Sequence, residues 1–228
     1  MTDRISMTAC VFDAYGTLFD SRGAVERRAA ELVGQAAVLS SRWRDTQLKY
    51  TWLRSLQGIY ENFERVTADA LDFTFDSLGI RNPRLRDELL ELYQTVPAFS
   101  DVLPMLEQLQ RSKIPCLILS NGTQSMLRSA TKAAGLDPFI DRILSADHVG
   151  VYKPSGRVYQ LAVDALDLPA EQIVFVSANG WDAYGAAAYG FRAIWCNRTG
   201  EVHERLPGSI PLELRSLQDL HRLLALSE

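Results

Sequence analysis

The chain has 228 residues, of which 47% are hydrophobic and 23% are charged, and its formal net charge is −4. These values are typical of a globular protein, and the acidic balance argues against a nucleic-acid partner. No apolar run reaches the roughly 18 residues that a membrane span needs, and the first six residues lack the apolar core of a signal peptide. Three cysteines lie far apart in apolar runs, which favours buried, reduced thiols: Cys10, Cys116 and Cys196. We therefore expect a cytoplasmic protein with no membrane partner.

The first predicted element is a strand over residues 8–13, an apolar run that ends in the carboxylate of Asp13. A turn-forming pair, Gly16-Thr17, follows shortly after it. In open α/β sheets, ligands bind outside the carboxyl ends of the strands. Asp13 is therefore expected to face a crevice rather than bulk water.

The next part of the chain, residues 21–98, contains no convincing strand. It shows helical patterns over residues 41–58 and 67–78. We interpret it as an all-helical cap domain inserted into a core domain that is formed by residues 1–20 and 99–228. Such an insertion would lie over the strand ends, where a lid belongs.

Strand and helix patterns alternate after the cap. Apolar runs over 116–119, 173–176 and 192–195 predict three more strands, the last of them nearer a sheet edge because it begins with Arg192. Helical patterns accompany them over residues 101–111, 123–135, 155–166 and 181–189. This alternation predicts an α/β fold, with a Rossmann-like, doubly wound parallel sheet as its core and the helical cap inserted after the first strand.

Polar segments are expected to gather at one edge of this sheet. They are Asp13 with Thr17, Ser120-Asn121-Gly122, the run from Ser177 to Asp182, and Lys153-Pro154 in a loop before a helix. Each segment alone has an ordinary explanation as a helix cap, a turn or a surface charge. In this order and around one edge, they indicate an active site.

Together these segments resemble the four motifs of the haloacid dehalogenase superfamily, most of whose members are phosphatases. The phosphatase pattern is Asp-x-Asp-Gly-Thr, in which the second Asp protonates the leaving alcohol, and a later Gly-Asp helps to hold Mg²⁺. Here Tyr15 stands at the second Asp, and Ser177-Ala178 stands at the Gly-Asp. Phosphoryl transfer needs both a cation and a proton, whereas a halide leaving group needs no proton and a monoanionic carboxylate substrate needs no metal. Both replacements favour dehalogenation without a metal or other cofactor.

Two stretches resemble the type II L-2-haloacid dehalogenases in particular. Residues 43–54, which begin Trp43-Arg44, match the first cap helix of that family, and residues 177–182 match a segment that commonly reads Ser-Ser-Asn-Ala-Trp-Asp there. The differences at Ala178 and Gly180 remove a hydroxyl and a methyl group without touching a catalytic role. The resemblance implies hydrolysis of short L-(S)-2-haloalkanoic acids to D-(R)-2-hydroxy acids, with inversion.

The same resemblance implies the catalytic roles. Asp13 is the nucleophile that attacks C2 of the substrate and forms an ester, and Lys153 keeps its carboxylate ionised. Thr17 hydrogen-bonds that carboxylate. Asp182 pairs with Lys153 and positions the hydrolytic water. The residues implied to help Asp182 position the water are Ser177 and Asn179. Tyr159, shortly after Lys153, matches a family tyrosine at the site but could also be an ordinary aromatic of a helix face.

The substrate contacts are implied in the same way. Arg44 on the cap binds the departing halide. Helical spacing alone would instead favour an ordinary arginine on the protein surface. Ser120, with backbone N–H groups near Ala14 and Tyr15, holds the substrate carboxylate. The groups implied to help Arg44 are Asn121 and Phe63. The apolar wall around C2 comprises Tyr15, Leu48, Phe63 and Trp181, which could also be ordinary core packing.

Several alternatives stay open on the sequence alone. A phosphatase of the same superfamily, a defluorinating variant that acts on fluoroacetate-like acids, and a catalytically silent binding protein are the competing functions. The preferred halogen and chain length are also open. The resemblance implies a homodimer formed through the cap helices. A helical stripe of Leu53, Leu56 and Tyr60 could form that contact or could pack within the cap.

Overall fold

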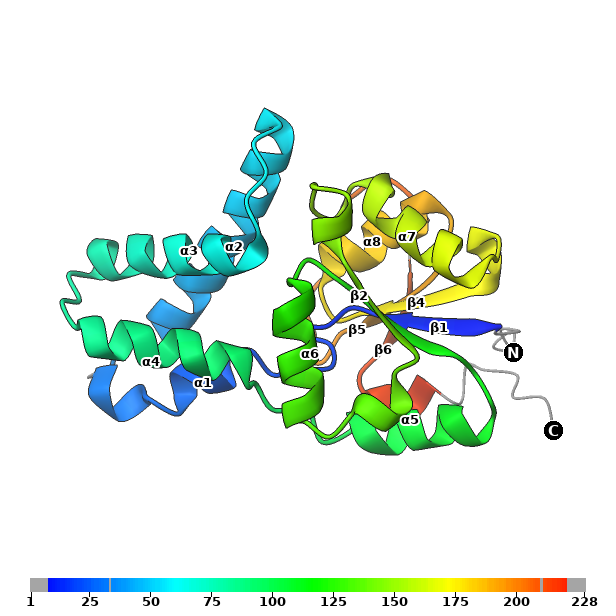
Figure 1. The fold of residues 1–228 in the computed structure, drawn as a ribbon, viewed down its shortest axis with the longest axis horizontal. Helices are drawn as coiled ribbons and strands as arrows, with labels where there is room; N and C mark the ends of the chain where they lie inside the picture. Colours follow the sequence, from blue (N-terminus) through cyan, green and yellow to red (C-terminus); the bar gives the residue numbers. More distant parts are fainter. Residues whose placement is uncertain (1–7, 33, 210, 221–228) are drawn as a thin grey trace.

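The computed structural model describes residues 8–32, 34–209 and 211–220, and its centre is a six-stranded parallel sheet (Figure 1). The strands are β1 (Ala9–Phe12), β2 (Cys116–Ser120), β3 (Arg142–Ser145), β4 (Ile173–Ser177), β5 (Arg192–Cys196) and β6 (Leu212–Leu214). Their order is β3-β2-β1-β4-β5-β6. The four predicted strands are confirmed, and β5 lies next to the edge strand. Because β1, β2 and β4 are buried at every position, the sheet is covered on both faces.

Helices lie on both sides of this sheet, with α7 and α8 on one side and α5 on the other (Figure 1). The core helices are α5 (Val102–Arg111), α6 (Gln124–Ala133), α7 (Gly156–Leu166) and α8 (Gly180–Tyr189). Short 3-10 turns occur at η1 (Ala29–Leu32), η2 (Asp137–Phe139), η3 (Ala146–His148), η4 (Ala170–Gln172) and η5 (Leu217–Asp219). The predicted core helices and the α/β fold class are confirmed.

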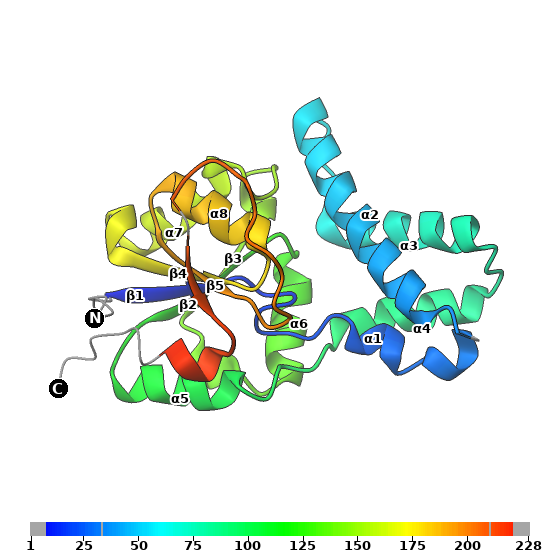
Figure 2. The ribbon, with the colours of Figure 1, turned by 180° about the vertical axis from the view of Figure 1, so that it is seen from behind.

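The cap consists of helices that stand apart from the sheet, beyond the end of β1 (Figure 2). They are α1 (Gly23–Glu26), α2 (Ala36–Gln57), α3 (Phe63–Leu78) and α4 (Pro83–Gln94). Local sequence fixes the ends of α3, because the Asn62 side chain accepts a hydrogen bond from Arg65 N at its start and Gly79 takes a left-handed conformation at its end. The two predicted cap helices are confirmed, and both begin four or five residues before their predicted starts.

The chain passes between core and cap twice, and the two crossings lie side by side. Asp20 N donates to Pro97 O at 2.8 Å, and Phe99 N donates to Leu18 O at 3.0 Å. Arg198, just after β5, ties these segments to the core: its guanidinium pairs with Asp101 at 2.6 Å and donates to Thr17 O at 3.0 Å. The cap is therefore connected to the core through two chain segments that lie next to each other.

One surface prediction needs correction. Helix α2 ends at Gln57, so Tyr60 does not continue a stripe of Leu53 and Leu56 on that helix. Its ring instead packs against Tyr152 of the core, with 5.2 Å between centroids. Gly58, in a left-handed conformation, ends the helix before Tyr60 is reached.

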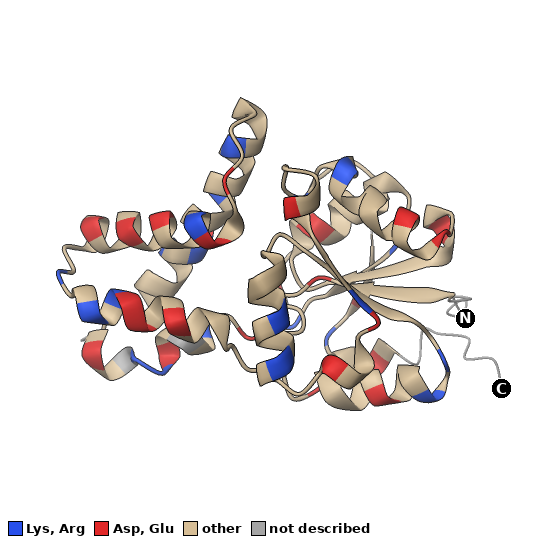
Figure 3. Cartoon of the chain, viewed as in Figure 1, with Lys and Arg blue, Asp and Glu red and all other residues tan. Residues whose placement is uncertain are grey.

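Other features of the described chain agree with its composition. All three cysteines are free and buried, as predicted. Charged residues of both signs occur along the cap helices (Figure 3). Among the described helices, none combines the length and the apolar character that a membrane crossing requires.

Candidate active site

The site forms where β1, β2 and β4 end at the same edge of the sheet. Asp13 directly follows β1, and its backbone N donates to Val176 O at 2.9 Å. Ser120 is the last residue of β2, and Ser177 is the last residue of β4. Because the three strands are parallel and adjacent, their carboxyl ends carry these side chains to one place.

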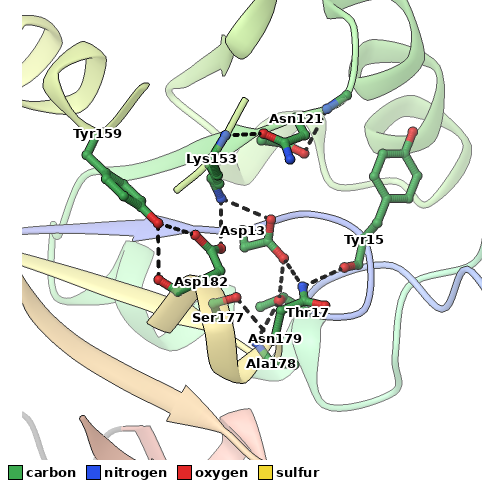
Figure 4. A network of polar contacts seen from close by, with 12 residues as sticks. Asp13, Tyr15, Thr17, Asn121, Lys153, Tyr159, Ser177, Ala178, Asn179 and Asp182 are labelled. Atoms are coloured by element: carbon green, nitrogen blue, oxygen red, sulfur yellow. Dashed lines mark hydrogen bonds and ion pairs between the residues drawn. The ribbon is translucent and has the colours of Figure 1, made fainter. Parts of the chain in front are cut away.

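A buried network of three charges occupies this edge (Figure 4). Lys153 Nζ lies 3.1 Å from Asp13 Oδ1 and 2.9 Å from Asp182 Oδ2. Lys153 is 1% exposed and Asp13 is 6% exposed, so water screens the network poorly. Burial alone would lower the pKa of Lys153, but its two carboxylate neighbours raise that pKa above the usual range. Lys153 is therefore held as a cation.

One cation shared by two carboxylates leaves the network with a net negative charge. Burial raises the pKa of Asp182 above its usual range, and the nearby charge of Asp13 adds to that effect, while Lys153 opposes it. Tyr159 OH donates to Asp182 Oδ1 at 2.8 Å and to Asp182 O at 3.2 Å. Tyr159 therefore belongs to the network rather than to a simple helix face.

Neutral donors hold the other oxygen of Asp13. Thr17 Oγ1 donates to Asp13 Oδ2 at 2.9 Å, and Asn179 Nδ2 donates to the same oxygen at 2.8 Å. Ala178 N donates in turn to Thr17 Oγ1 at 2.8 Å. The carboxylate is thus fixed in position.

The two strand-end serines and Asn121 shape the neighbouring turns. Ser120 Oγ accepts from Gly122 N at 3.2 Å, and Ser177 Oγ accepts from Asn179 N at 3.2 Å. Each hydroxyl keeps its own proton for a further acceptor. Asn121 Oδ1 accepts from Lys153 N at 2.9 Å, so it fixes the lysine loop.

Arg44 on α2 brings the cap to this site. One terminal nitrogen donates to Gln47 Oε1 at 2.8 Å and the other donates to Asn179 Oδ1 at 3.1 Å. Within the described residues, Arg44 makes no ion pair with a carboxylate. Its positive charge therefore meets neutral oxygens and stays available to an anion.

The sequence reasoning missed the residues that hold Arg44. Gln47 is buried, and its Nε2 donates to Thr67 Oγ1 at 2.7 Å and to Tyr93 OH at 3.2 Å. Gln47 lies one turn from Arg44 on the same face of α2, a spacing that could have identified it. Tyr93 comes from α4, far along the chain, and no local pattern points to it.

Aromatic side chains form a wall on the cap side. Tyr15 packs between Phe63 and Tyr93, with ring centroids 6.0 and 5.0 Å away. Burial raises the pKa of Tyr15 well above its usual value, so the hydroxyl stays neutral. Trp181 meets Trp52 of α2 edge-on at 5.4 Å. Leu48 is half-buried, on the same helix face as Arg44 and Trp52.

The donor set does not fit a magnesium site of the phosphatase kind. Both oxygens of Asp13 are taken by protein donors, one of them by a cation. The position of the second metal-binding acid is Ala178. In the described part of the chain, no group of three or more His, Cys, Asp or Glu residues is arranged to hold a metal ion.

Comparison with known proteins assigns the chain to a family. The model of the haloacid dehalogenase-like hydrolases matches residues 7–190. Over 217 residues, 95% of this chain and 96% of the relative, the sequence is 42% identical to (S)-2-haloacid dehalogenase 1 of Pseudomonas sp. strain CBS-3. Over 208 residues, 91% of this chain and 90% of the relative, it is 44% identical to the (S)-2-haloacid dehalogenase of Pseudomonas sp. strain YL. This chain belongs to the (S)-2-haloacid dehalogenases.

A solved member of the family supports the same assignment. The L-2-haloacid dehalogenase of Xanthobacter autotrophicus, solved with chloropropionic acid covalently bound, has a TM-score of 0.88 and 30% identity to this chain. The match covers 95% of this chain and 98% of that one. The predicted family and the predicted helical cap over an α/β core are therefore confirmed, and the chain is a hydrolase.

Proposed function

We propose that this dehalogenase hydrolyses short L-(S)-2-haloalkanoic acids to D-(R)-2-hydroxy acids through an ester on Asp13. The observation that carries the proposal is that Asp13 contacts one cation directly, Lys153, and is linked through Asn179 to a second cation of a different kind, Arg44. Lys153, at 3.1 Å, is neutralised by its acids, whereas Arg44 has only neutral partners. The relatives are named for this substrate class.

In the first step, Asp13 attacks C2 of the substrate from the side opposite the halogen. A carbon–oxygen bond forms as the carbon–halogen bond breaks, and the halide leaves with the bonding electron pair. Inversion at C2 follows from this geometry. Arg44, with the amide of Asn121 and the edge of Phe63, receives the halide. The negative charge that develops on the halogen is stabilised by Arg44, which has only neutral hydrogen-bond partners.

In the second step, water attacks the carbonyl carbon of the ester. Asp182, Ser177 and Asn179 position this water. One proton of the water ends on the hydroxyl of the product and the other is released, so that Asp13 returns to its ionised form. Lys153 stays charged throughout and stabilises both states of the carboxyl group.

The substrate is held by its own carboxylate. Ser120 Oγ and the backbone N–H groups of Ala14 and Tyr15 bind that carboxylate, and the hydroxyl of Ser120 still has its proton to donate. The side chain on C2 packs against the apolar wall, which also keeps bulk water from the ester. The wall is formed by Tyr15, Leu48, Phe63 and Trp181.

The reaction proceeds without a metal ion. Lys153 supplies the cation beside Asp13, and Tyr15 and Ala178 stand where a phosphatase has carboxylates. The same replacements disfavour phosphatase activity, because they remove the proton donor for an alcohol leaving group.

The chain is divided into a core domain of residues 1–20 and 99–228 and a cap domain of residues 21–98. The protein acts in the cytoplasm, which its three free cysteines support.

The protein forms a homodimer through the outer face of α2, where Leu53 is 45% exposed and Leu56 is 84% exposed. Light scattering of Leu56→Glu beside wild type tests the dimer, which the variant is expected to weaken.

Chloride release from L-2-chloropropionate in the presence of EDTA tests the reaction and its metal independence together. We expect full activity in EDTA and a loss of at least about 10⁴-fold in Asp13→Asn. Lack of chloride release by the folded wild type, or undiminished release by Asp13→Asn, would refute the proposed function. Activity that requires Mg²⁺ would refute the metal independence.

A further inference from the structure

A small cavity opens beside the candidate active site, next to Arg44. Its volume is about 190 Å³. The residues that matter for its chemistry are Gly16, Asp20, Arg22, Arg44, Asn179 and Arg198. It lies outside the aromatic wall, none of whose residues line it.

The side chain of Asn179 links this cavity to Asp13. Asn179 lines the cavity and donates to Asp13 Oδ2 at 2.8 Å, while its own oxygen accepts from Arg44 at 3.1 Å. Asp13 is only 6% exposed, so ligands must reach it from an adjoining space. The cavity adjoins it on the side where Arg44 would release a halide.

The cavity is positively charged, although the whole chain carries −4. Three arginines and one acid line it. Arg198 is neutralised by Asp101 at 2.6 Å, and Asp20 accepts from the backbone N of Arg22 at 3.2 Å. Within the described residues, neither the Arg22 nor the Arg44 guanidinium makes an ion pair. Two cations, one inner and one at the exposed rim, are thus left without a carboxylate partner.

We infer that this cavity is an outer binding site for small monovalent anions, with Arg22 as the cation at its rim. The inference rests on the proposed function, which supplies two such anions, the haloacid substrate and the halide product. A cation at the mouth of a site raises the local concentration of an anionic substrate. The halide would pass from Arg44 towards Arg22 as it leaves.

Charge changes at Arg22 test the inference, with Arg27 as a matched control. Arg27 is also exposed, lies at the other end of α1, and does not line the cavity. At low ionic strength, we expect KM for L-2-chloropropionate to rise about threefold in Arg22→Gln and about tenfold in Arg22→Glu, and the difference from wild type to shrink in high salt. The corresponding Arg27 variants should match wild type. Equal KM values for the Arg22 and Arg27 variants would overturn the inference.

A second measurement does not depend on turnover. Crystals soaked in bromide should show anomalous scattering beside the Arg22 guanidinium in wild type and none there in Arg22→Gln. Bromide bound only at Arg44, or at neither residue, would overturn the outer site even if the enzyme releases halide. Bromide at Arg22 in a protein that releases no halide from any haloacid would instead refute the proposed function and leave the anion site standing.

Discussion

Lys153 contacts Asp13 directly and Arg44 is linked to it through Asn179, and these two cations are held by different kinds of partner. Lys153 comes from the core and lies between two buried carboxylates. Arg44 comes from the cap and donates to the amide oxygens of Gln47 and Asn179. A cation paired with carboxylates sets the charge of its neighbours, whereas a cation held by neutral oxygens keeps its charge for a ligand. The core half is thus suited to hold a nucleophile and the cap half to receive an anion.

Removal of the core cation should have the largest effect. Lys153→Met leaves two buried carboxylates without their counter-charge, and loss of one partner of a buried ion pair costs about 3–5 kcal/mol. We expect the free energy of unfolding in urea to fall by about this amount, together with loss of chloride release. Lys132→Met, at an exposed position of α6, is the control. If both variants unfolded alike, the buried network would not contribute to stability.

Replacement of the cap cation should affect activity and leave stability nearly unchanged. Arg44→Lys keeps the charge but loses the planar fork that reaches Gln47 and Asn179 together. We expect kcat/KM to fall by about 10²- to 10³-fold, while the free energy of unfolding changes by less than about 0.5 kcal/mol. Arg42→Lys, exposed on the same helix, serves as control. A stability loss as large as that of Lys153→Met would remove the proposed difference between the two halves.

A charge placed beside Arg44 should reduce its capacity for halide. Gln47→Glu preserves the length of the side chain and gives Arg44 the carboxylate partner that it lacks. We expect kcat/KM to fall by about tenfold and inhibition by bromide to weaken. Gln57→Glu, at the exposed end of α2, makes the same charge change away from the site. Wild-type kinetics in Gln47→Glu would contradict the idea that an uncompensated cation is what the cap supplies.

The smallest predicted effect concerns the pH dependence. The hydrogen bond from Tyr159 lowers the pKa of Asp182, which burial raises. Tyr159→Phe should therefore raise that pKa further, so that activity is lost at a higher pH as the solution is acidified. At neutral pH, the loss should be only a fewfold. A pH profile of kcat checks this, with Tyr189→Phe as the control. An unshifted acid limb would show that Asp182 need not be ionised in the rate-limiting step.

Most of the residues that the core contributes to the site could be predicted from the sequence. Asp13, Ser120 and Ser177 stand at the ends of strongly apolar runs, so local patterns locate them. The strands β3 and β6 escaped prediction because they are short and only the last residue of each is buried, so neither forms an apolar run. The ion pair of Arg198 with Asp101 joins residues 97 positions apart. No local pattern reports such a contact.

The cap half could be predicted only in part. Arg44 was identified from its resemblance to a family helix, but its partners were not. Gln47 is a polar residue whose burial depends on Thr67 and Tyr93, which arrive from two other helices. The packing of α2, α3 and α4 places Gln47 where it accepts a hydrogen bond from Arg44. The periodicity of apolar residues indicates which segments form helices, but it gives little information on which residues those helices contact.

The paired crossings between core and cap have a consequence for engineering. Because Asp20 bonds to Pro97 and Phe99 bonds to Leu18, the cap departs and returns at neighbouring points. An exchange of the intervening segment for that of another family member would leave every strand pairing of the sheet in place, since none involves that segment. The segment carries Arg44, Leu48 and Phe63. The cap's proposed share of the substrate contacts would therefore be exchanged in one piece, while Tyr15, Ser120 and Trp181 would stay with the core.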